Sequence, residues 1–428
     1  MVQSLELSLP AAIVFVSRLS VRTLIHNELR SRSVFKITTC ESLAACLTAL
    51  SADPTALLIV DSDQDERELV QSLRAAQGHY RIDTRPIYLI AYAASEKILS
   101  YAIEYNILQL HKGELSKAQF ELNFGEMMHY SLRTPLQLDV FDKVVKAKRA
   151  ERRDEVYALL LSLWKAEPDN IQAADELGLA LCDLDQWDDA ELHLIEIVAK
   201  FPFDTRAKHL LARCFMKKTD FERARYYLEQ ASLLSPFNAE RLCDLGQVLL
   251  DEYHLAEALG TFREALALEP DLQAAKVGKT QCELLLGEAN EALKMIRQMQ
   301  DPFEFASVFN GAAIVAVRAG YFSQGIGLYQ TATGYLLEYP SLMSRVFFNM
   351  GIGLWKWGKG SLAVAAFEKA VELDGSNAKA KHNADRLSLS MKKRSSSAHD
   401  DSEGPFNALN RIDTMDDFDE ITEEGFPR

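Results

Sequence analysis

A repeat of 34 residues fills the middle of this sequence. Proline recurs at this interval, at Pro168, Pro202, Pro236 and Pro270. Alanine recurs with the same period, and a large apolar residue follows each alanine after four residues, as in Ala190 and Leu194. Because proline cannot continue a helix, each unit is predicted to be a helical hairpin that ends near its proline. One hairpin cannot bury its own apolar face, so the units are predicted to stack.

Small residues occupy a further position of the repeat, at Gly178, Ala212 and Gly246. The combined pattern resembles the tetratricopeptide repeat, a helix-turn-helix unit of this length. The resemblance implies an α-solenoid whose first helices line a concave groove, and a groove of this kind commonly holds a peptide or a partner helix. The fold class expected for this part of the chain is therefore all-α.

The repeat frame divides the second part of the chain. Clear units cover residues 171–204, 205–238 and 239–272. The unit from 273 has Lys279 and Thr280 where leucine and glycine are expected, so its packing is in doubt. Residues 131–170 are predicted to be a helical linker with a degenerate leading repeat, and 171–392 to be the repeat domain, with a polar capping helix over 377–392.

The first 130 residues have a different rhythm. Short apolar runs alternate with amphipathic stretches, at Ile13–Val16, Val34–Thr38, Leu57–Val60, Ile87–Ile90 and Ile107–Leu110. Such runs predict a parallel sheet of five strands covered on both faces. The arrangement resembles the receiver domain of bacterial response regulators, which implies a flavodoxin-like, doubly wound α/β fold for residues 1–130.

The receiver resemblance also assigns candidate site residues. In that family an aspartate ending the third strand accepts a phosphoryl group and a lysine after the fifth strand contacts it, and Asp61 and Lys112 stand at the matching places. The acidic pair that holds Mg²⁺ in the family is replaced by Ser17 and Arg18, and the hydroxyl residue that ends the fourth strand by Ala91. Phosphoryl transfer relies on such a metal to neutralise developing charge.

These departures predict a pseudo-receiver in which Arg18 forms an ion pair with Asp61 in place of the metal. Three interpretations of Asp61 stay open. It could be simply a polar strand end, a working phosphoacceptor, or part of an ion-pair switch that needs no phosphate. No resident cofactor is expected, and Mg²⁺ is implied only if Asp61 is phosphorylated.

The predicted groove carries basic and amide side chains at helical spacing. They are Arg206, His209, Arg213, Lys217, Asn310, Arg318, Arg345 and Asn349. Asparagine combined with arginine or lysine resembles the way related repeats hold the backbone or carboxylate of a peptide. The alternative is that these residues are an ordinary solvated surface.

Residues 393–428 are predicted to be a disordered acidic tail, since their composition cannot support a packed core. Apolar residues nevertheless recur every three residues among its acids, at Phe406, Leu409, Ile412, Met415 and Phe418. This spacing predicts an amphipathic motif that folds when it docks, either on the groove of this chain or on a partner. The alternative is a solubilising tail.

The charge balance argues against nucleic acid as a partner. The 428 residues contain 62 acids and 47 bases, a formal net charge of −15, and a negative field repels phosphate backbones. The six cysteines form no C-x-x-C pair and are predicted to be reduced core thiols, and no segment suits a signal peptide or a membrane span, so a cytoplasmic location is expected.

No nucleotide-binding loop, nucleophile elbow or paired catalytic carboxylates occur in a suitable context, so no enzymatic activity is assigned. The sequence therefore favours a non-catalytic bacterial scaffold or adaptor of the two-component type, which binds proteins through its groove and its receiver-like domain. The alternative is a genuine phosphorelay response regulator, phosphorylated on Asp61, with the repeats as its output. A nucleic-acid regulator is a third hypothesis, which the charge disfavours.

Overall fold

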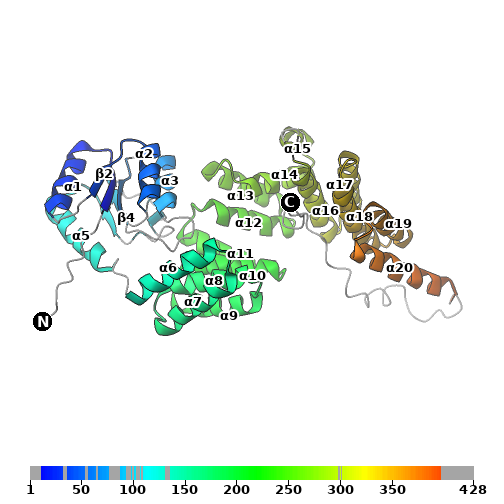
Figure 1. Cartoon of the computed structure of the whole chain (residues 1–428). Helices are drawn as coiled ribbons and strands as arrows, with labels where there is room; N and C mark the ends of the chain where they lie inside the picture. The colour runs from blue at the N-terminus through cyan, green and yellow to red at the C-terminus, as the bar shows by residue number, and fades with distance from the viewer. Residues whose placement is uncertain are drawn as a thin grey trace. The chain divides into compact units, whose positions relative to one another are not determined.

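The computed structural model describes most of the chain. The described residues are 11–31, 36–53, 56–63, 66–76, 87–92, 98, 101–102, 107, 109–130, 135–296, 299 and 301–396. The chain separates into two compact units, Met1–Asn238 and Ala239–Arg428. The first contains a sheet with its helices and three helical hairpins, and the second contains the remaining helices (Figure 1).

The sheet confirms the five parallel strands expected from the apolar runs. They are β1 (Ala11–Phe15), β2 (Lys36–Thr39), β3 (Leu57–Asp61), β4 (Ile87–Ala91) and β5 (Gln109–Lys112). Their order in the sheet is β2-β1-β3-β4-β5, and every neighbouring pair is parallel. Strand β5 extends two residues past the apolar run that predicted it and so includes Lys112.

Alternating strand residues point to two separate cores, one on each face of the sheet. Val14 and Ile59 pack with the helices α1 (Leu19–Ser31) and α5 (Lys117–Tyr130). Ile13, Phe15 and Val60 pack on the opposite face, in the core that contains residues of α2 (Leu43–Ala52) and α3 (Glu66–Ala76). This two-sided burial is why the inner strands β1, β3 and β4 are buried throughout and largely apolar, whereas the outer strands β2 and β5 carry polar residues. The helices on the two faces of the sheet are visible in Figure 1.

The helices after residue 134 form hairpins at the positions that the repeat predicts. In the first unit they are α6 (Pro135–Arg149), α7 (Arg153–Ala166), α8 (Ile171–Asp183), α9 (Trp187–Lys200), α10 (Thr205–Lys217) and α11 (Phe221–Leu234). In the second unit they are α12 (Ala239–Asp251), α13 (Leu255–Leu268), α14 (Gln273–Leu286), α15 (Ala289–Ile296), α16 (Pro302–Arg318), α17 (Phe322–Tyr335), α18 (Pro340–Lys356), α19 (Gly360–Leu373) and α20 (Ala378–Ser396).

The repeating alanine and the apolar residue after it form the seam of each hairpin. Ala190, Leu194, Ala258 and Phe262 are all fully buried on the second helices of their hairpins. The small residue on the first helix lies against this seam, since a Cβ added to Gly178 would stand 2.6 Å from Cδ2 of Leu194. The predicted role of the small residue, close approach of the two helices, is confirmed.

The unit from residue 273 packs on its neighbour through a different contact. A Cβ added to Gly278 on α14 would stand 2.2 Å from Cζ of Phe262 on α13, so Gly278 makes a close approach to the second helix of the preceding hairpin. Thr280, at the expected position, is buried, and its hydroxyl donates to the carbonyl of Lys276 over 2.8 Å. The backbone thus satisfies the hydroxyl without a partner from another helix.

Among the helices of the described residues, none combines the length and the apolar character needed to cross a bilayer.

Candidate functional site

Asp61 ends strand β3, and its side chain is fully buried. The backbone N–H of Ser17 donates to Oδ2 of Asp61 over 2.9 Å, and the Ser17 hydroxyl donates to Oδ1 over 3.0 Å. The Tyr92 hydroxyl donates to Oδ2 over 3.2 Å. Ser17 lies just after β1 and Tyr92 directly after β4, the two strands that flank β3, so donors on both sides enclose the carboxylate.

Arg18 pairs with two other acids. Its Nε lies 2.6 Å from Oδ2 of Asp63, and its Nη1 lies 2.6 Å from Oε1 of Glu114. The guanidinium carbon stands 3.4 Å from the centroid of the Tyr92 ring. The predicted ion pair between Arg18 and Asp61 is therefore wrong, because Ser17 bonds both oxygens of Asp61 and the guanidinium stacks on Tyr92.

Tyr92 and Glu114 are site residues that sequence reasoning missed. Burial, together with the charge of Asp61 and the hydrogen bond to it, raises the pKa of the Tyr92 phenol, so the hydroxyl stays a donor at neutral pH. The sequence contained a signal for Tyr92. Ala91 stands where the receiver family has a hydroxyl residue, and Tyr92, the next residue, carries a hydroxyl.

Lys112 ends β5 with an exposed side chain. Ala91 pairs with Lys112 and Ile90 pairs with Asp61 in the strand register, so Asp61 and Lys112 lie at the same edge of the sheet. Across the described part of the chain, no three His, Cys, Asp or Glu side chains are grouped so that they could hold a metal ion.

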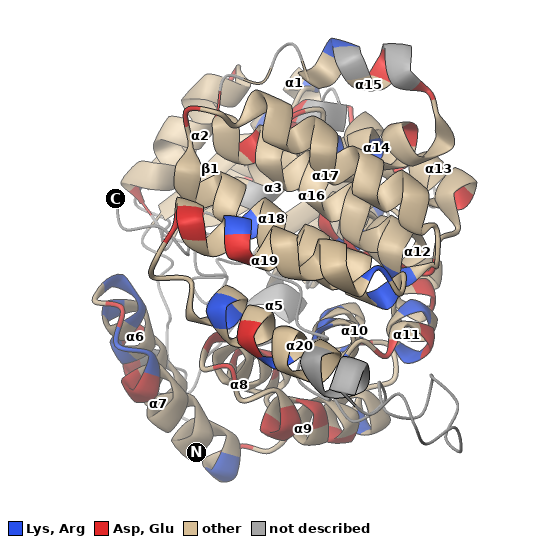
Figure 2. Cartoon of the chain, turned by 90° about the vertical axis from the view of Figure 1, so that its right-hand side faces the viewer, with Lys and Arg blue, Asp and Glu red and all other residues tan. Residues whose placement is uncertain are grey.

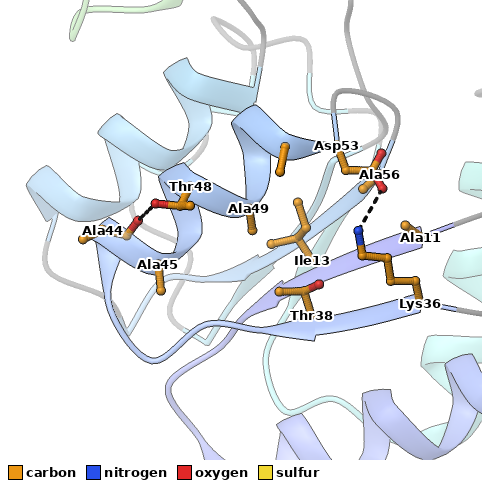
Figure 3. A pocket seen from close by; sticks show the side chains of 11 residues that line it. Ala11, Ile13, Lys36, Thr38, Ala44, Ala45, Thr48, Ala49, Asp53 and Ala56 are labelled. Carbon is orange, nitrogen blue, oxygen red and sulfur yellow. Dashed lines mark hydrogen bonds and ion pairs between the residues drawn. The ribbon is translucent and has the colours of Figure 1, made fainter.

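A pocket of about 520 Å³ lies elsewhere in the sheet domain, over β1, β2 and α2 (Figure 3). Ala11 and Lys36, the first residues of their strands, line it, whereas Asp61 is the last residue of β3. Most of the lining is alanine, and Lys36 reaches Asp53 with Nζ 3.9 Å from Oδ2. Its lining residues include none of the candidate site.

A buried carboxylate joins three successive first helices of the hairpins in the first unit. Glu176 on α8 has a side chain with no exposed surface. Its Oε2 lies 2.7 Å from Nζ of Lys148 on α6, and its Oε1 lies 2.5 Å from Nη2 of Arg206 on α10. Burial acts to raise the pKa of Glu176, but the charges of Arg206 and Lys148 outweigh it, and the pKa is lowered.

Asp175, the neighbour of Glu176 in sequence, is buried where its negative charge is disfavoured. Burial and the adjacent carboxylate of Asp204 raise its pKa well above the usual value. Its Oδ1 lacks a hydrogen-bond partner, whereas Oδ1 of Asp204 caps α10 by accepting from the backbone N–H groups of Arg206 and Ala207. Nη1 of Arg206 stands 4.0 Å from Oδ2 of Asp175.

The basic residues predicted to line the groove on α10 thus differ in what they contact. Arg206 is held within the repeat stack by Glu176 and is not the surface cation that its spacing suggested. His209 is half-buried, and Lys217 is exposed with Nζ 5.7 Å from the centroid of the Trp187 ring. Arg213 is exposed and forms no ion pair with any residue that the structure describes.

Two of the four predicted groove residues of the second unit are internal. Asn310 on α16 and Asn349 on α18 are buried, and Nδ2 of Asn349 donates to Oδ1 of Asn310 over 2.9 Å. Their prediction as surface binding residues is corrected, because this hydrogen bond joins the two amides between the neighbouring first helices α16 and α18. Arg318 is partly exposed, with Nη1 3.5 Å from Oδ1 of Asp251, and Arg345 is half-buried.

The predicted docking motif, from Phe406 to Phe418, lies outside the described residues, as do all residues after Ser396.

Comparisons with known proteins agree with the repeat. A family model for the tetratricopeptide repeat matches residues 176–239. A DnaJ homolog subfamily C member 7 homolog of Schizosaccharomyces pombe is 26% identical over 208 residues, which are 45% of this chain and 43% of that protein. This chain therefore spans less than half the length of that relative.

Two solved structures are also similar. A tetratricopeptide repeat protein from Parabacteroides merdae has 13% identity and a TM-score of 0.43, and the match covers 60% of this chain and all of that one. The crystal structure of MamA has 20% identity and a TM-score of 0.33, with 35% of this chain and 88% of that chain covered.

Proposed function

We propose that this protein is a non-catalytic signalling scaffold that binds other proteins through its repeats and through a degenerate receiver-like domain. The observation that carries the proposal is how Asp61 and the acids near it are bonded. Asp63 and Glu114 pair with Arg18, and Ser17 and Tyr92 donate to Asp61 itself. A fixed cation and neutral donors thus take the places where phosphoryl transfer needs a metal ion.

The receiver-like part of the proposal rests on topology. The strand order β2-β1-β3-β4-β5 is the order of flavodoxin-like, doubly wound folds. Ligands of such folds bind beyond the carboxyl ends of the strands, where Asp61 and Lys112 stand. We propose that this edge keeps the receiver architecture as a protein-binding surface and has lost the chemistry.

The repeat part of the proposal rests on the exposed cations of α10. Arg206, Asn310 and Asn349 join neighbouring helices, whereas Arg213 and Lys217 are exposed, and Nζ of Lys217 lies near the Trp187 ring. We propose that Arg213, the guanidinium of the two, pairs with a ligand. An exposed guanidinium binds a carboxylate with two parallel hydrogen bonds. We therefore propose an acidic side chain or a chain terminus of a partner protein as the group that contacts α10.

Phosphorylation of the full-length protein tests the first part. Incubation with acetyl phosphate and Mg²⁺, followed by intact-mass measurement, is expected to leave the protein unmodified, as it leaves Asp61→Asn unmodified. A stoichiometric phosphoryl adduct that Asp61→Asn abolishes would establish the second candidate function, a phosphorelay regulator with Mg²⁺ as cofactor. That candidate is favoured by the position of Asp61 and Lys112 at one edge of the sheet.

Charge reversal of the groove tests the second part. In pull-downs from native lysate, Arg213→Glu is expected to lose a specific protein that the unaltered chain retains. Lys165→Glu on α7 is the matched control, since it makes the same charge change at an exposed site on the second helix of a hairpin. Equal recovery by both variants would make Arg213 an ordinary surface residue.

We also propose that the tail motif docks on the first unit. A synthetic peptide of residues 402–428 is expected to bind a chain shortened to residues 1–396, with lower affinity at high salt and for Arg213→Glu. Titration calorimetry at low salt measures this, and no heat of binding at any salt concentration would leave the tail as a solubilising segment.

A further inference from the structure

Two cysteines from neighbouring repeats meet inside the first unit. Cys182 lies in the last turn of α8 and Cys214 in the last turn of α10, 32 residues apart in sequence. Their Sγ atoms are 3.9 Å apart, and both side chains are buried, with 7% and 0% of their surface exposed. A sequence search for C-x-x-C pairs cannot find such a contact, because the repeat fold creates it.

We propose that Cys182 and Cys214 are a modification site, at which a hydroperoxide forms a reversible disulfide that joins α8 to α10. The two sulfurs already touch, and a disulfide would bring them to about 2.05 Å. Closing that gap requires a small approach of two helices that pack directly against each other.

The chemistry balances with the hydroperoxide as the oxidant. The Cys182 thiolate attacks one peroxide oxygen, so an S–O bond forms, the O–O bond breaks, and the leaving hydroxide takes a proton to become water. The Cys214 sulfur then attacks the sulfenic sulfur of Cys182. An S–S bond forms, the S–O bond breaks, and the leaving oxygen takes the Cys214 proton as a second water. Two thiols are oxidised and one peroxide is reduced.

Exposure favours Cys182 as the attacking sulfur, since 7% of its surface is accessible and none of that of Cys214. The hydrogen bond with Cys214 and the positive charge of Arg213 also lower the pKa of Cys182, against the effect of burial. The same hydrogen bond and burial raise the pKa of Cys214. Cys214 is therefore the resolving thiol, which needs to be only close and not ionised in advance.

The other cysteines provide internal comparisons. Burial raises the pKa of Cys243 and of Cys282 to about 12, and neither has a sulfur within hydrogen-bonding distance among the described residues. Cys40 is hydrogen-bonded to Cys46, but burial raises its pKa. Contact and a lowered pKa thus coincide at Cys182.

The disulfide would fix the part of the repeat stack that carries the charged groove. Helices α8 and α10 hold Glu176, Arg206 and Arg213, and Arg213 is the chain neighbour of Cys214. A cross-link between them would restrict any change in the spacing of these helices. This inference stands on the cysteine geometry alone and does not depend on the proposed partner.

Hydrogen peroxide treatment of the full-length protein tests the proposal. The thiol count measured after unfolding is expected to fall from six to four, since two of the six thiols are consumed, and dithiothreitol is expected to restore it. Mass spectrometry of a non-reduced digest should find the peptides of Cys182 and Cys214 joined, with the loss of two hydrogens. Cys243→Ser, a matched control in the second unit, should keep the same cross-link.

Single variants separate the two roles. In Cys214→Ser, Cys182 is expected to accumulate sulfenic acid that a 1,3-diketone reagent traps. In Cys182→Ser, Cys214 is expected to stay a thiol. Circular dichroism checks that both variants remain helical. The proposal is overturned if the folded protein keeps all six thiols, if the cross-link joins Cys40 to Cys46, or if Cys182 reacts no faster than Cys243.

Discussion

The first helices of the hairpins join their neighbours by different means in the two units. In the first unit the buried carboxylate of Glu176 bridges Lys148 and Arg206. In the second unit a neutral amide of Asn349 bonds Asn310, and Figure 2 shows helices α16 to α18 almost without charged residues. The same backbone repeat therefore tolerates both ionic and neutral links between successive units.

The ionic link at Glu176 and the amide link at Asn349 should respond differently to the loss of one partner. Removing two charges from water costs several kcal/mol per ion, and only the attraction between the partners offsets it. An amide pair has a much smaller desolvation cost and needs no countercharge. The link at Glu176 should thus respond strongly to loss of one charge and to pH, and the link at Asn349 should respond weakly.

Loss of the central carboxylate should have the largest effect. Glu176→Ala leaves Lys148 and Arg206 largely buried without their partner, which is expected to cost about 3–5 kcal/mol of stability in the first unit. Native-state hydrogen exchange of α8 and α10 measures this in the full-length protein. Glu222→Ala on α11 is the matched control, since that glutamate is exposed, and it should change exchange by less than about 0.5 kcal/mol. Equal effects would refute a structural role for the buried bridge.

The neutral link should be weaker. Asn349→Ala removes a buried hydrogen bond to Asn310 and is expected to cost about 1–3 kcal/mol in exchange from α16 and α18. Raising the salt concentration should leave this cost unchanged. A loss as large as that of Glu176→Ala, or one that depends on salt, would remove the distinction between the two units.

The contacts of the small residues give a second comparison. In Gly178→Ala the new Cβ meets the flexible end of Leu194, so the change should be nearly neutral, because the better helix propensity of alanine offsets the crowding. In Gly278→Ala it meets the ring of Phe262, which is fully buried and also lies against Gly246. We expect Gly278→Ala to cost about 1–2 kcal/mol by overpacking.

Exchange of α8 and α9 reports the first of these variants, and exchange of α13 and α14 reports the second. A neutral Gly278→Ala would mean that Phe262 can move, and that the contact between α13 and α14 is loose.

The fold could be predicted from the sequence because its signals are local. A strand buried on both faces must be apolar throughout, and a helical hairpin must repeat its small and large residues to pack. Both patterns can be found without knowing what lies opposite. The contact of Gly278 was missed because Phe262 lies on the preceding hairpin, whereas the repeat pattern predicts the contacts within one hairpin.

The candidate sites depend on partners that are distant in sequence. Helical spacing predicted that Arg206 and Asn349 each lie on the groove side of their own helix. It could not reveal that Glu176, 30 residues before Arg206, and Asn310, 39 residues before Asn349, form hydrogen bonds with them. The spacing predicted that Arg18 would pair with Asp61, yet Arg18 pairs with Asp63 and with Glu114, which lies 96 residues later. A charged side chain pairs with the opposite charges that the fold brings near it, so spacing in the sequence alone does not determine its ion pairs.

The pH dependence of the stability of the first unit is the smallest predicted effect. Asp175 and Glu176 contribute to it with opposite signs. Asp175 has a raised pKa, because burial and Asp204 disfavour its charged form. The folded protein therefore binds more protons here than the unfolded chain, and this group lowers stability as pH rises above the ordinary value of 3.8. Glu176 has a lowered pKa, so its contribution is present above the ordinary value of 4.5 and is lost as pH falls below it.

Asp175→Asn should consequently stabilise α8 and α10 at neutral pH by about 1 kcal/mol, the scale of one unpaired buried polar group. The gain should shrink as pH falls toward the ordinary value of 3.8, near which Asp175 is protonated in the unfolded chain as well. Hydrogen exchange of the two helices, corrected for intrinsic rates between pH 5 and 8, measures the slope, and Asp244→Asn on α12 controls for a general charge effect. A loss at neutral pH would mean that Arg206 stabilises the charged form of Asp175 more than burial and Asp204 oppose it. A gain that does not change with pH would mean that the ionisation of Asp175 is not its cause.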